Sequence, residues 1–125
     1  MNKKILIPAI LFIAVVLAAV IMLVKDNGNQ PPKSESSIAL YYGDGCPHCA
    51  IVDEFLKENN VEGKVSYEKK EVYNNKKNAD ELAERAKTCD LPTDSIGVPF
   101  LWDGSKCLIG DKDIINFFKQ RMGLN

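Results

Sequence analysis

From residue 38 onward, the apolar residues follow strand spacing and helical spacing in alternation. Ile38–Tyr42 and Val98–Trp102 are short apolar runs typical of buried strands, whereas Ala50–Asn59 and Asn78–Lys87 repeat apolar residues at helical spacing. The whole pattern predicts, in chain order, strand Ile38–Tyr42, helix Pro47–Asn59, strand Lys64–Val72, helix Asn78–Lys87, strands Val98–Trp102 and Lys106–Ile109, and a helix from Asp111 to Gly123.

Within these elements the spacing also predicts which side chains face a core. In the first helix, Ile51, Val52, Phe55 and Leu56 form the expected inward stripe. The segment Lys64–Val72 becomes highly charged toward its end, which is typical of an edge strand.

Turn and cap signals complete the pattern. Asp103-Gly104 predicts a tight hairpin between the last two strands. Asp111 is the expected cap of the last helix. The lysine pairs Lys69-Lys70 and Lys76-Lys77 alternate with glutamate and asparagine, which predicts a solvated face.

The N-terminal segment has a different pattern. Ile5–Val24 is a run of 20 residues without a charge, and as a helix it would measure about 30 Å, the thickness of a bilayer's hydrocarbon core. Lys3 and Lys4 precede it, so the positive-inside bias predicts a single-pass anchor with a cytoplasmic N-terminus and an exported C-terminal domain. A cleaved signal peptide is the alternative, because a basic start and an apolar run are common to both.

The domain organisation follows from this contrast. We expect a membrane anchor in residues 1–24, a flexible linker over Lys25–Ser37 that is rich in Asn, Pro and Ser, and a folded domain over Ile38–Asn125. The chain of 125 residues is 46% hydrophobic and carries a formal net charge of -1. It is therefore long enough for one small domain, and the balance of charges gives no field that would attract nucleic acid.

The stretch with the clearest chemistry is Gly45-Cys46-Pro47-His48-Cys49, between the first strand and the first helix. Pro47 suits the first helical position, which places Cys46 at or next to the N-cap. There the free N–H groups and the positive end of the helix dipole stabilise a thiolate, the species that attacks a disulfide. Cys46 is therefore the candidate nucleophile and Cys49, three residues further on the inward face, the candidate resolving cysteine.

His48 lies inside the ring that these cysteines would close. If it is charged, or donates a hydrogen bond to the Cys46 sulfur, it stabilises the reduced form and makes the disulfide a stronger oxidant. The alternative is a histidine that points into solvent.

Other uses of the two cysteines can be weighed against redox chemistry. A c-type haem site needs histidine directly after the second cysteine, where this chain has Ala50. A zinc site usually needs four ligands, which would require a distant cysteine besides Cys46, His48 and Cys49. A purely structural disulfide is the third alternative. We expect no metal and no cofactor.

The element order, with Cys-X-X-Cys after the first strand and Val98-Pro99 opening the third, resembles the thioredoxin superfamily. Its brevity is similar to the glutaredoxin-like branch, and Cys46-Pro47-His48-Cys49 resembles the active site of DsbA-type periplasmic oxidases. The resemblance implies an α/β fold with a mixed four-stranded sheet and flanking helices after the N-terminal transmembrane helix. It also implies a cis Val98–Pro99 bond facing Cys46, with Val98 and Pro99 docking the backbone of an extended substrate.

In the fold that the resemblance implies, the end of the second helix and the hairpin between the last two strands reach the same end of the sheet. We therefore expect a structural disulfide between Cys89 and Cys107, with two separate buried thiols as the alternative. Four cysteines in an exported domain fit an oxidising compartment.

Together these features predict a membrane-anchored, extracytoplasmic thiol–disulfide oxidoreductase that forms or exchanges disulfides in exported proteins. Its expected partners are thiol- or disulfide-bearing proteins and a membrane redox partner. The alternatives are a reductase or isomerase supplied with electrons by a membrane partner, a module that handles a metal such as copper through Cys46 and Cys49, and an adhesive domain with a vestigial site.

Overall fold

The computed structural model describes residues 10–19 and 38–124, and the chain divides into two compact units, Met1–Ser34 and Glu35–Asn125. In the first unit, residues 10–19 form a helix. Over the described parts of both units, we find no helix that has both the length and the apolar character needed to cross a bilayer. The remainder of the expected span Ile5–Val24, and the expected linker Lys25–Ser37, lie outside the described residues.

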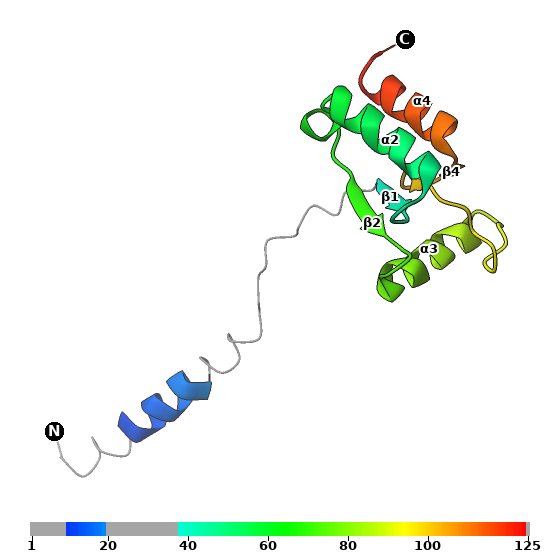
Figure 1. Ribbon diagram of the computed structural model, residues 1–125. Helices are drawn as coiled ribbons and strands as arrows, with labels where there is room; N and C mark the ends of the chain where they lie inside the picture. Colours follow the sequence, from blue (N-terminus) through cyan, green and yellow to red (C-terminus); the bar gives the residue numbers. More distant parts are fainter. Residues whose placement is uncertain (1–9, 20–37, 125) are drawn as a thin grey trace, which may run out of the picture. The chain divides into compact units, whose positions relative to one another are not determined.

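The second unit alternates strands and helices in the predicted order (Figure 1). Its elements are β1 (Ala39–Tyr42), α2 (Pro47–Glu58), the short 3₁₀ helix η1 (Val61–Gly63), β2 (Glu68–Glu71), α3 (Lys76–Thr88), β3 (Phe100–Trp102), β4 (Cys107–Ile109) and α4 (Asp111–Arg121). The strands are shorter than predicted. Val65 and Tyr67, for example, join the core before β2 begins.

The four strands form one mixed sheet in the order β2-β1-β3-β4. Strand β1 pairs in parallel with β2 and antiparallel with β3, and β3 pairs antiparallel with β4. Strand β2 is therefore at an edge, as its charged sequence predicts. The β3–β4 hairpin is also confirmed: Asp103 N–H donates to the Lys106 carbonyl at 3.1 Å, and the Asp103 carboxylate accepts from the Lys106 N–H at 2.7 Å.

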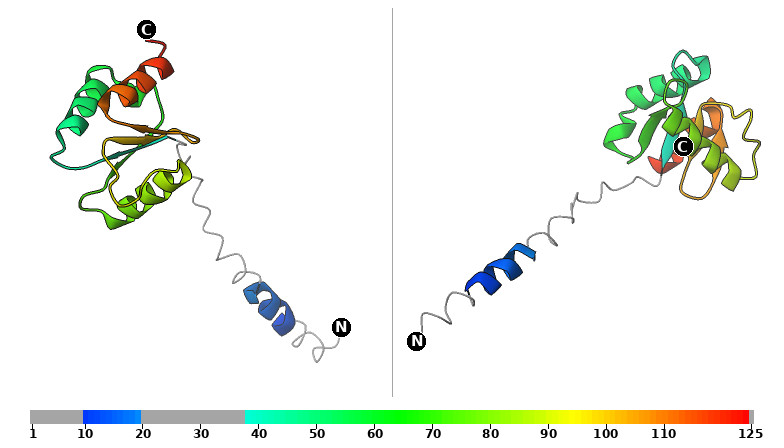
Figure 2. Two further views of the ribbon diagram at one scale, coloured as in Figure 1. Left: turned by 90° about the vertical axis from the view of Figure 1, so that its right-hand side faces the viewer. Right: turned by 90° about the horizontal axis from the view of Figure 1, so that it is seen from below.

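Successive strand residues point to opposite sides of the sheet, so the buried strands present apolar side chains on both faces. Both faces are covered by helices. Helices α2 and α4 lie over one face and α3 lies over the other (Figure 2). The buried residues on the α2 and α4 side are Ile38, Leu40, Val52, Leu56, Val61, Val65, Leu101, Ile114 and Phe118. Those on the α3 side are Ala39, Tyr41, Leu82, Ala86 and Phe100. This α/β arrangement is compatible with a thioredoxin-like fold.

Two side-chain predictions in the helices are wrong. Helix α2 buries Cys49, Val52 and Leu56, and Ile51 is 45% exposed because it lies one residue off this stripe. Helix α4 has Gly110 at its N-cap, with a φ of +93° that favours glycine, and Asp111 is the first helical residue instead of the cap. The Asp111 carboxylate is thereby free to contact a neighbouring helix.

The predicted solvated face of lysines is wrong at Lys70. Its side chain is only 19% exposed and its Nζ lies 2.6 Å from Glu81 of α3. Lys76 does match the prediction, since its side chain is 86% exposed and pairs with Asp80 one turn along the helix. The difference arises because Lys70 lies on a strand that α3 covers, which the lysine pattern alone does not indicate.

Candidate redox site

Cys46 occupies the N-cap of α2. Its backbone is extended, with φ −74° and ψ 118°, and Pro47 follows at the start of the helix. The Cys49 N–H donates to the Cys46 sulfur at 3.2 Å. The Cys46 sulfur thus accepts a hydrogen bond as an N-cap side chain does. Negative charge on this sulfur is stabilised both by this N–H donor and by the positive end of the helix dipole.

Cys46 and Cys49 form a disulfide, and the two sulfurs differ in their surroundings. Cys49 is 7% exposed and lies on the same face of α2 as Val52 and Leu56. Cys46 is half-buried. An attacking thiolate therefore reaches Cys46 more readily than Cys49.

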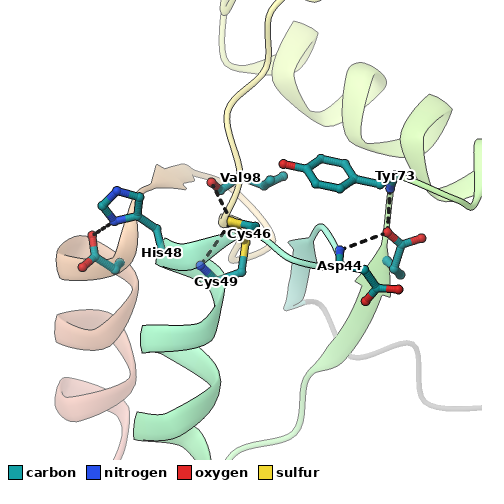
Figure 3. Close-up of a disulfide and its surroundings, with 8 residues drawn as sticks. Asp44, Cys46, His48, Cys49, Tyr73 and Val98 are labelled. Carbon is teal, nitrogen blue, oxygen red and sulfur yellow. Dashed lines mark hydrogen bonds and ion pairs between the residues drawn. A yellow bond between two sulfur atoms is a disulfide. The ribbon is translucent and has the colours of Figure 1, made fainter.

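The loop before β3 brings a second chain segment against the disulfide. The Val98–Pro99 peptide bond is cis, and the Val98 carbonyl oxygen lies 3.6 Å from the Cys46 sulfur (Figure 3). Pro99 is buried, and its carbonyl accepts from the Gly110 N–H at 2.9 Å. Residues 98 and 99, which the sequence places with the cysteines by resemblance alone, thus lie beside them in the structure.

His48 points toward α4. Its imidazole is 67% exposed, and its Nδ1 lies 3.4 Å from an oxygen of Asp111, whose side chain is 22% exposed. Figure 3 shows the ring directed at this carboxylate and away from the Cys46 sulfur. His48 therefore links the redox helix α2 to the first turn of α4, a contact that the sequence did not reveal.

On the opposite side of the disulfide lies a group of residues that the sequence did not single out. Glu71, the last residue of β2, accepts from the Tyr73 N–H at 2.7 Å and from the Asp44 N–H at 3.4 Å. Burial alone would raise the pKa of Glu71, but backbone N–H donors, Asn74 and Tyr73 foremost, hold it below its usual value. One carboxylate therefore ties the β2–α3 connection to the loop that precedes Cys46.

A pocket of about 330 Å³ opens beside the disulfide, on the α2 side of the sheet. Its lining includes both cysteines and Pro99, with Asp44, Asp53 and Lys69 as charged members. Asp53 pairs with Lys57 and with Lys69, and hydrogen bonds from Lys57 and then Lys69 lower its pKa. The pocket therefore has an apolar interior, a compensated ion pair and direct access to the sulfurs.

The other two cysteines, Cys89 and Cys107, form the disulfide expected from the sequence, with 6.3 Å between their Cα atoms. Cys89 is the C-cap residue of α3, and Cys107 opens β4 opposite Trp102. Trp102 in turn pairs with Ala39 at the start of β1, whereas Cys46 follows the end of β1. The two disulfides therefore lie at opposite ends of the sheet.

No group of three or more His, Cys, Asp and Glu side chains in residues 10–19 and 38–124 is placed to hold a metal ion. No protein-family model matches this chain, and neither does any curated protein sequence. The site geometry and the sequence are therefore the basis for the function proposed below.

Proposed function

We propose that this chain is a thiol–disulfide oxidoreductase of the thioredoxin superfamily, glutaredoxin-like in size, with Cys46 and Cys49 as its redox couple. The observation that carries the proposal is the position of Cys46: it caps the N-terminus of α2 and receives the Cys49 N–H. Such a position stabilises a thiolate, lowering cysteine pKa values from about 8.5 into the range of about 3.5 to 7.5.

In the oxidising direction, a substrate thiolate attacks the Cys46 sulfur and breaks the Cys46–Cys49 bond. Cys49 leaves as a thiolate, takes up a proton, and a mixed disulfide joins the substrate to Cys46. The second substrate thiolate then attacks the substrate sulfur of this bond and releases Cys46 as a thiolate. The substrate loses two electrons and two protons as it becomes a disulfide. The protein gains the two electrons, one proton goes to Cys49, and the other goes to Cys46 or to solvent.

Two features support this direction and this kind of substrate. The helix N-terminus stabilises the reduced form, so the disulfide is a good oxidant. The Val98 carbonyl, next to the cis Pro99 and 3.6 Å from Cys46, offers a backbone edge for an extended polypeptide.

The cellular setting is also part of the proposal. We propose that Ile5–Val24 anchors the chain in a membrane with the catalytic domain outside the cytoplasm, where a membrane redox partner reoxidises the dithiol. The sequence supports this through the uncharged run of 20 residues and the preceding Lys3 and Lys4. The second disulfide is consistent with an oxidising compartment.

The experiment that tests the activity is trapping in cells with Cys49→Ala. Without the resolving cysteine, substrates stay bonded to Cys46 and appear as mixed disulfides that dithiothreitol releases. The control is the double variant Cys46→Ala and Cys49→Ala, which should trap nothing. An absence of mixed disulfides with Cys49→Ala, or equal trapping by the double variant, would overturn the redox assignment.

The location is tested with the same Cys49→Ala chain. A membrane-impermeant maleimide added to intact cells or spheroplasts should label Cys46 if the domain faces outward. Deleting residues 1–24 should abolish both this labelling and recovery with the membrane fraction. Labelling that appears only after lysis would contradict an exported domain while leaving the chemistry untouched.

A further inference from the structure

Tyr73 is an exposed aromatic residue beside the redox site that the proposed chemistry does not use. It lies in the connection between β2 and α3 and is 60% exposed. Among the described residues of the second unit, no other large hydrophobic side chain is as exposed. Its position matters more than its exposure, because the ring lies against the loop that precedes Cys46 and can contact a polypeptide bound at that sulfur.

The structure fixes the backbone of Tyr73 firmly. Glu71 accepts from the Tyr73 N–H at 2.7 Å and from the Asn74 N–H at 2.9 Å. The same carboxylate accepts from Asp44 in the loop before Cys46. Three N–H donors on one ionised carboxylate hold the connection and the redox loop in one arrangement.

The ring itself rests on the backbone of Gly43. A Cβ on Gly43 would overlap the Cε2 and Cζ atoms of the Tyr73 ring, so only glycine permits this close approach. The Gly43 carbonyl accepts from the Cys46 N–H at 3.2 Å. Gly43 therefore contacts both the ring of Tyr73 and the backbone of Cys46.

Figure 3 shows the ring of Tyr73 reaching across the redox loop toward Val98. Val98 is the residue whose carbonyl lies against the Cys46 sulfur. An extended substrate chain paired with this edge would place the neighbours of its reacting cysteine about 3.3 Å further along per residue. The side chain next to the substrate cysteine thus comes within reach of the Tyr73 ring.

We propose that Tyr73 is a specificity-determining residue that selects polypeptide substrates with a large apolar or aromatic side chain beside the reacting cysteine. The inference rests on the proposed function and names the substrate class of that same site. Such a side chain covers the exposed ring in the mixed disulfide, whereas a serine or glycine leaves it in water. Aromatic pairs of this kind correspond to a preference of about 3-fold to 10-fold.

The test uses the oxidised full-length chain and two reduced peptides, each with two cysteines. The peptides are identical except at the residues that flank both cysteines, which are tryptophan in one and serine in the other. The rate of disulfide transfer is followed by acid quench, alkylation and mass analysis. Each peptide rate is divided by the rate at which dithiothreitol reduces the same variant. This division removes any effect of a substitution on the general reactivity of the Cys46–Cys49 bond.

For the unaltered chain we expect the tryptophan peptide to react about 3-fold to 10-fold faster than the serine peptide after this division. Tyr73→Ala should bring the ratio close to one, and Tyr73→Phe should keep it. Gly43→Ala keeps the tyrosine at position 73 but pushes its ring away from the redox loop, so it should also lower the ratio. Leu124→Ala, an exposed apolar residue near the C-terminus at 41% exposure, is the matched control and should keep the ratio.

The outcomes separate this inference from the proposed function. Equal divided rates for the two peptides with the unaltered chain overturn the preference, while transfer itself upholds the proposed function. A ratio that survives Tyr73→Ala overturns the role of Tyr73. No transfer to either peptide overturns the proposed function and the inference with it.

Discussion

The two disulfides of this domain lie at opposite ends of their helices. Cys46 caps the N-terminus of α2, where free N–H groups and the positive end of the dipole stabilise a thiolate. Cys89 is the C-cap residue of α3, where free carbonyls and the negative end of the dipole disfavour one. Stabilising the thiolate stabilises the reduced pair, so the first bond is the easier of the two to reduce.

Their surroundings extend the contrast. Cys46 receives an N–H donor from Cys49, whereas the Cys107 sulfur lies 3.4 Å from the carbonyl oxygen of Arg85. The first bond joins residues 3 apart in sequence and the second joins residues 18 apart. A short loop constrains the unfolded chain little and a long one constrains it more. These placements favour reactivity for the Cys46–Cys49 bond and a stabilising role for the Cys89–Cys107 bond.

The largest expected effect comes from removing Cys46, the proposed nucleophile. Cys46→Ser should reduce disulfide transfer to the rate seen without protein. In the described domain, no other cysteine sulfur is both accessible and located at a helix N-terminus. Thermal unfolding followed by circular dichroism should change little. Transfer that persists in Cys46→Ser would assign reactivity to the other disulfide and break the comparison.

The order of reduction sharpens the same contrast. Titration with dithiothreitol, quenched by alkylation and read by peptide mass mapping, should open Cys46–Cys49 under milder conditions than Cys89–Cys107. The thiolate of Cys46, followed by its ultraviolet absorbance, should titrate below the ordinary cysteine pKa of about 8.5. Simultaneous opening of both bonds, or earlier opening of Cys89–Cys107, would contradict the opposite placement of the two pairs on their helices.

Removing the second disulfide should affect stability instead of chemistry. The double variant Cys89→Ser and Cys107→Ser should lose roughly 3 kcal/mol in the free energy of unfolding in the chain-entropy description of loop closure. Urea denaturation measures this loss, and peptide disulfide transfer measured on the folded protein should continue. Unchanged stability together with lost transfer would reverse the roles given to the two bonds.

The smallest expected effect concerns the polar contacts under α3. Tyr41 donates to Glu81 at 2.9 Å and Lys70 donates to the same carboxylate at 2.6 Å. Burial alone would raise the pKa of Glu81, but the hydrogen bonds from Lys70 and Tyr41 lower it below 4.5. Glu81→Gln should therefore lower the free energy of unfolding at neutral pH by about 1 kcal/mol.

The pH dependence of this difference has a definite sign. A lowered carboxylate pKa contributes stability that is present above the unfolded value and is lost as the pH falls through the folded value. The gap between the unaltered protein and Glu81→Gln should narrow as the pH falls below 4.5. Glu84→Gln, an exposed residue of the same helix, is the control and should show neither effect. A gap that stays constant into acid would contradict the network.

The features that the sequence predicted well depend on short-range physics. The N-cap position of Cys46 follows from the adjacent Pro47, and the inward position of Cys49 follows from helical spacing to Val52 and Leu56. The edge position of β2 follows from its charges. Each of these depends on residues within one or two turns of the chain, which is the range that spacing and capping rules describe.

The features that the sequence did not predict depend on contacts between distant segments. Tyr73 reads as an ordinary loop residue until β2 places it over Gly43, thirty positions earlier. Asp111 was expected to cap α4, and the structure places it against His48 of another helix. Ile51 looked like a core residue because α2 has more apolar positions than its buried face can accommodate. Gly43 is the only residue in the sequence that hints at this contact, and a glycine in a loop does not by itself indicate which side chain packs on it.

The position of the Cys89–Cys107 disulfide also affects what happens to the domain when a protease cuts it. Cys89 and Cys107 lie on either side of the exposed loop that leads into Val98 and Pro99, so the bond closes this part of the backbone into a covalent ring. A single cut in residues 92–95 would yield two polypeptides that stay joined through sulfur. The nicked protein would migrate as one species until reductant is added, and Val98 and Pro99 would remain attached to the rest of the domain.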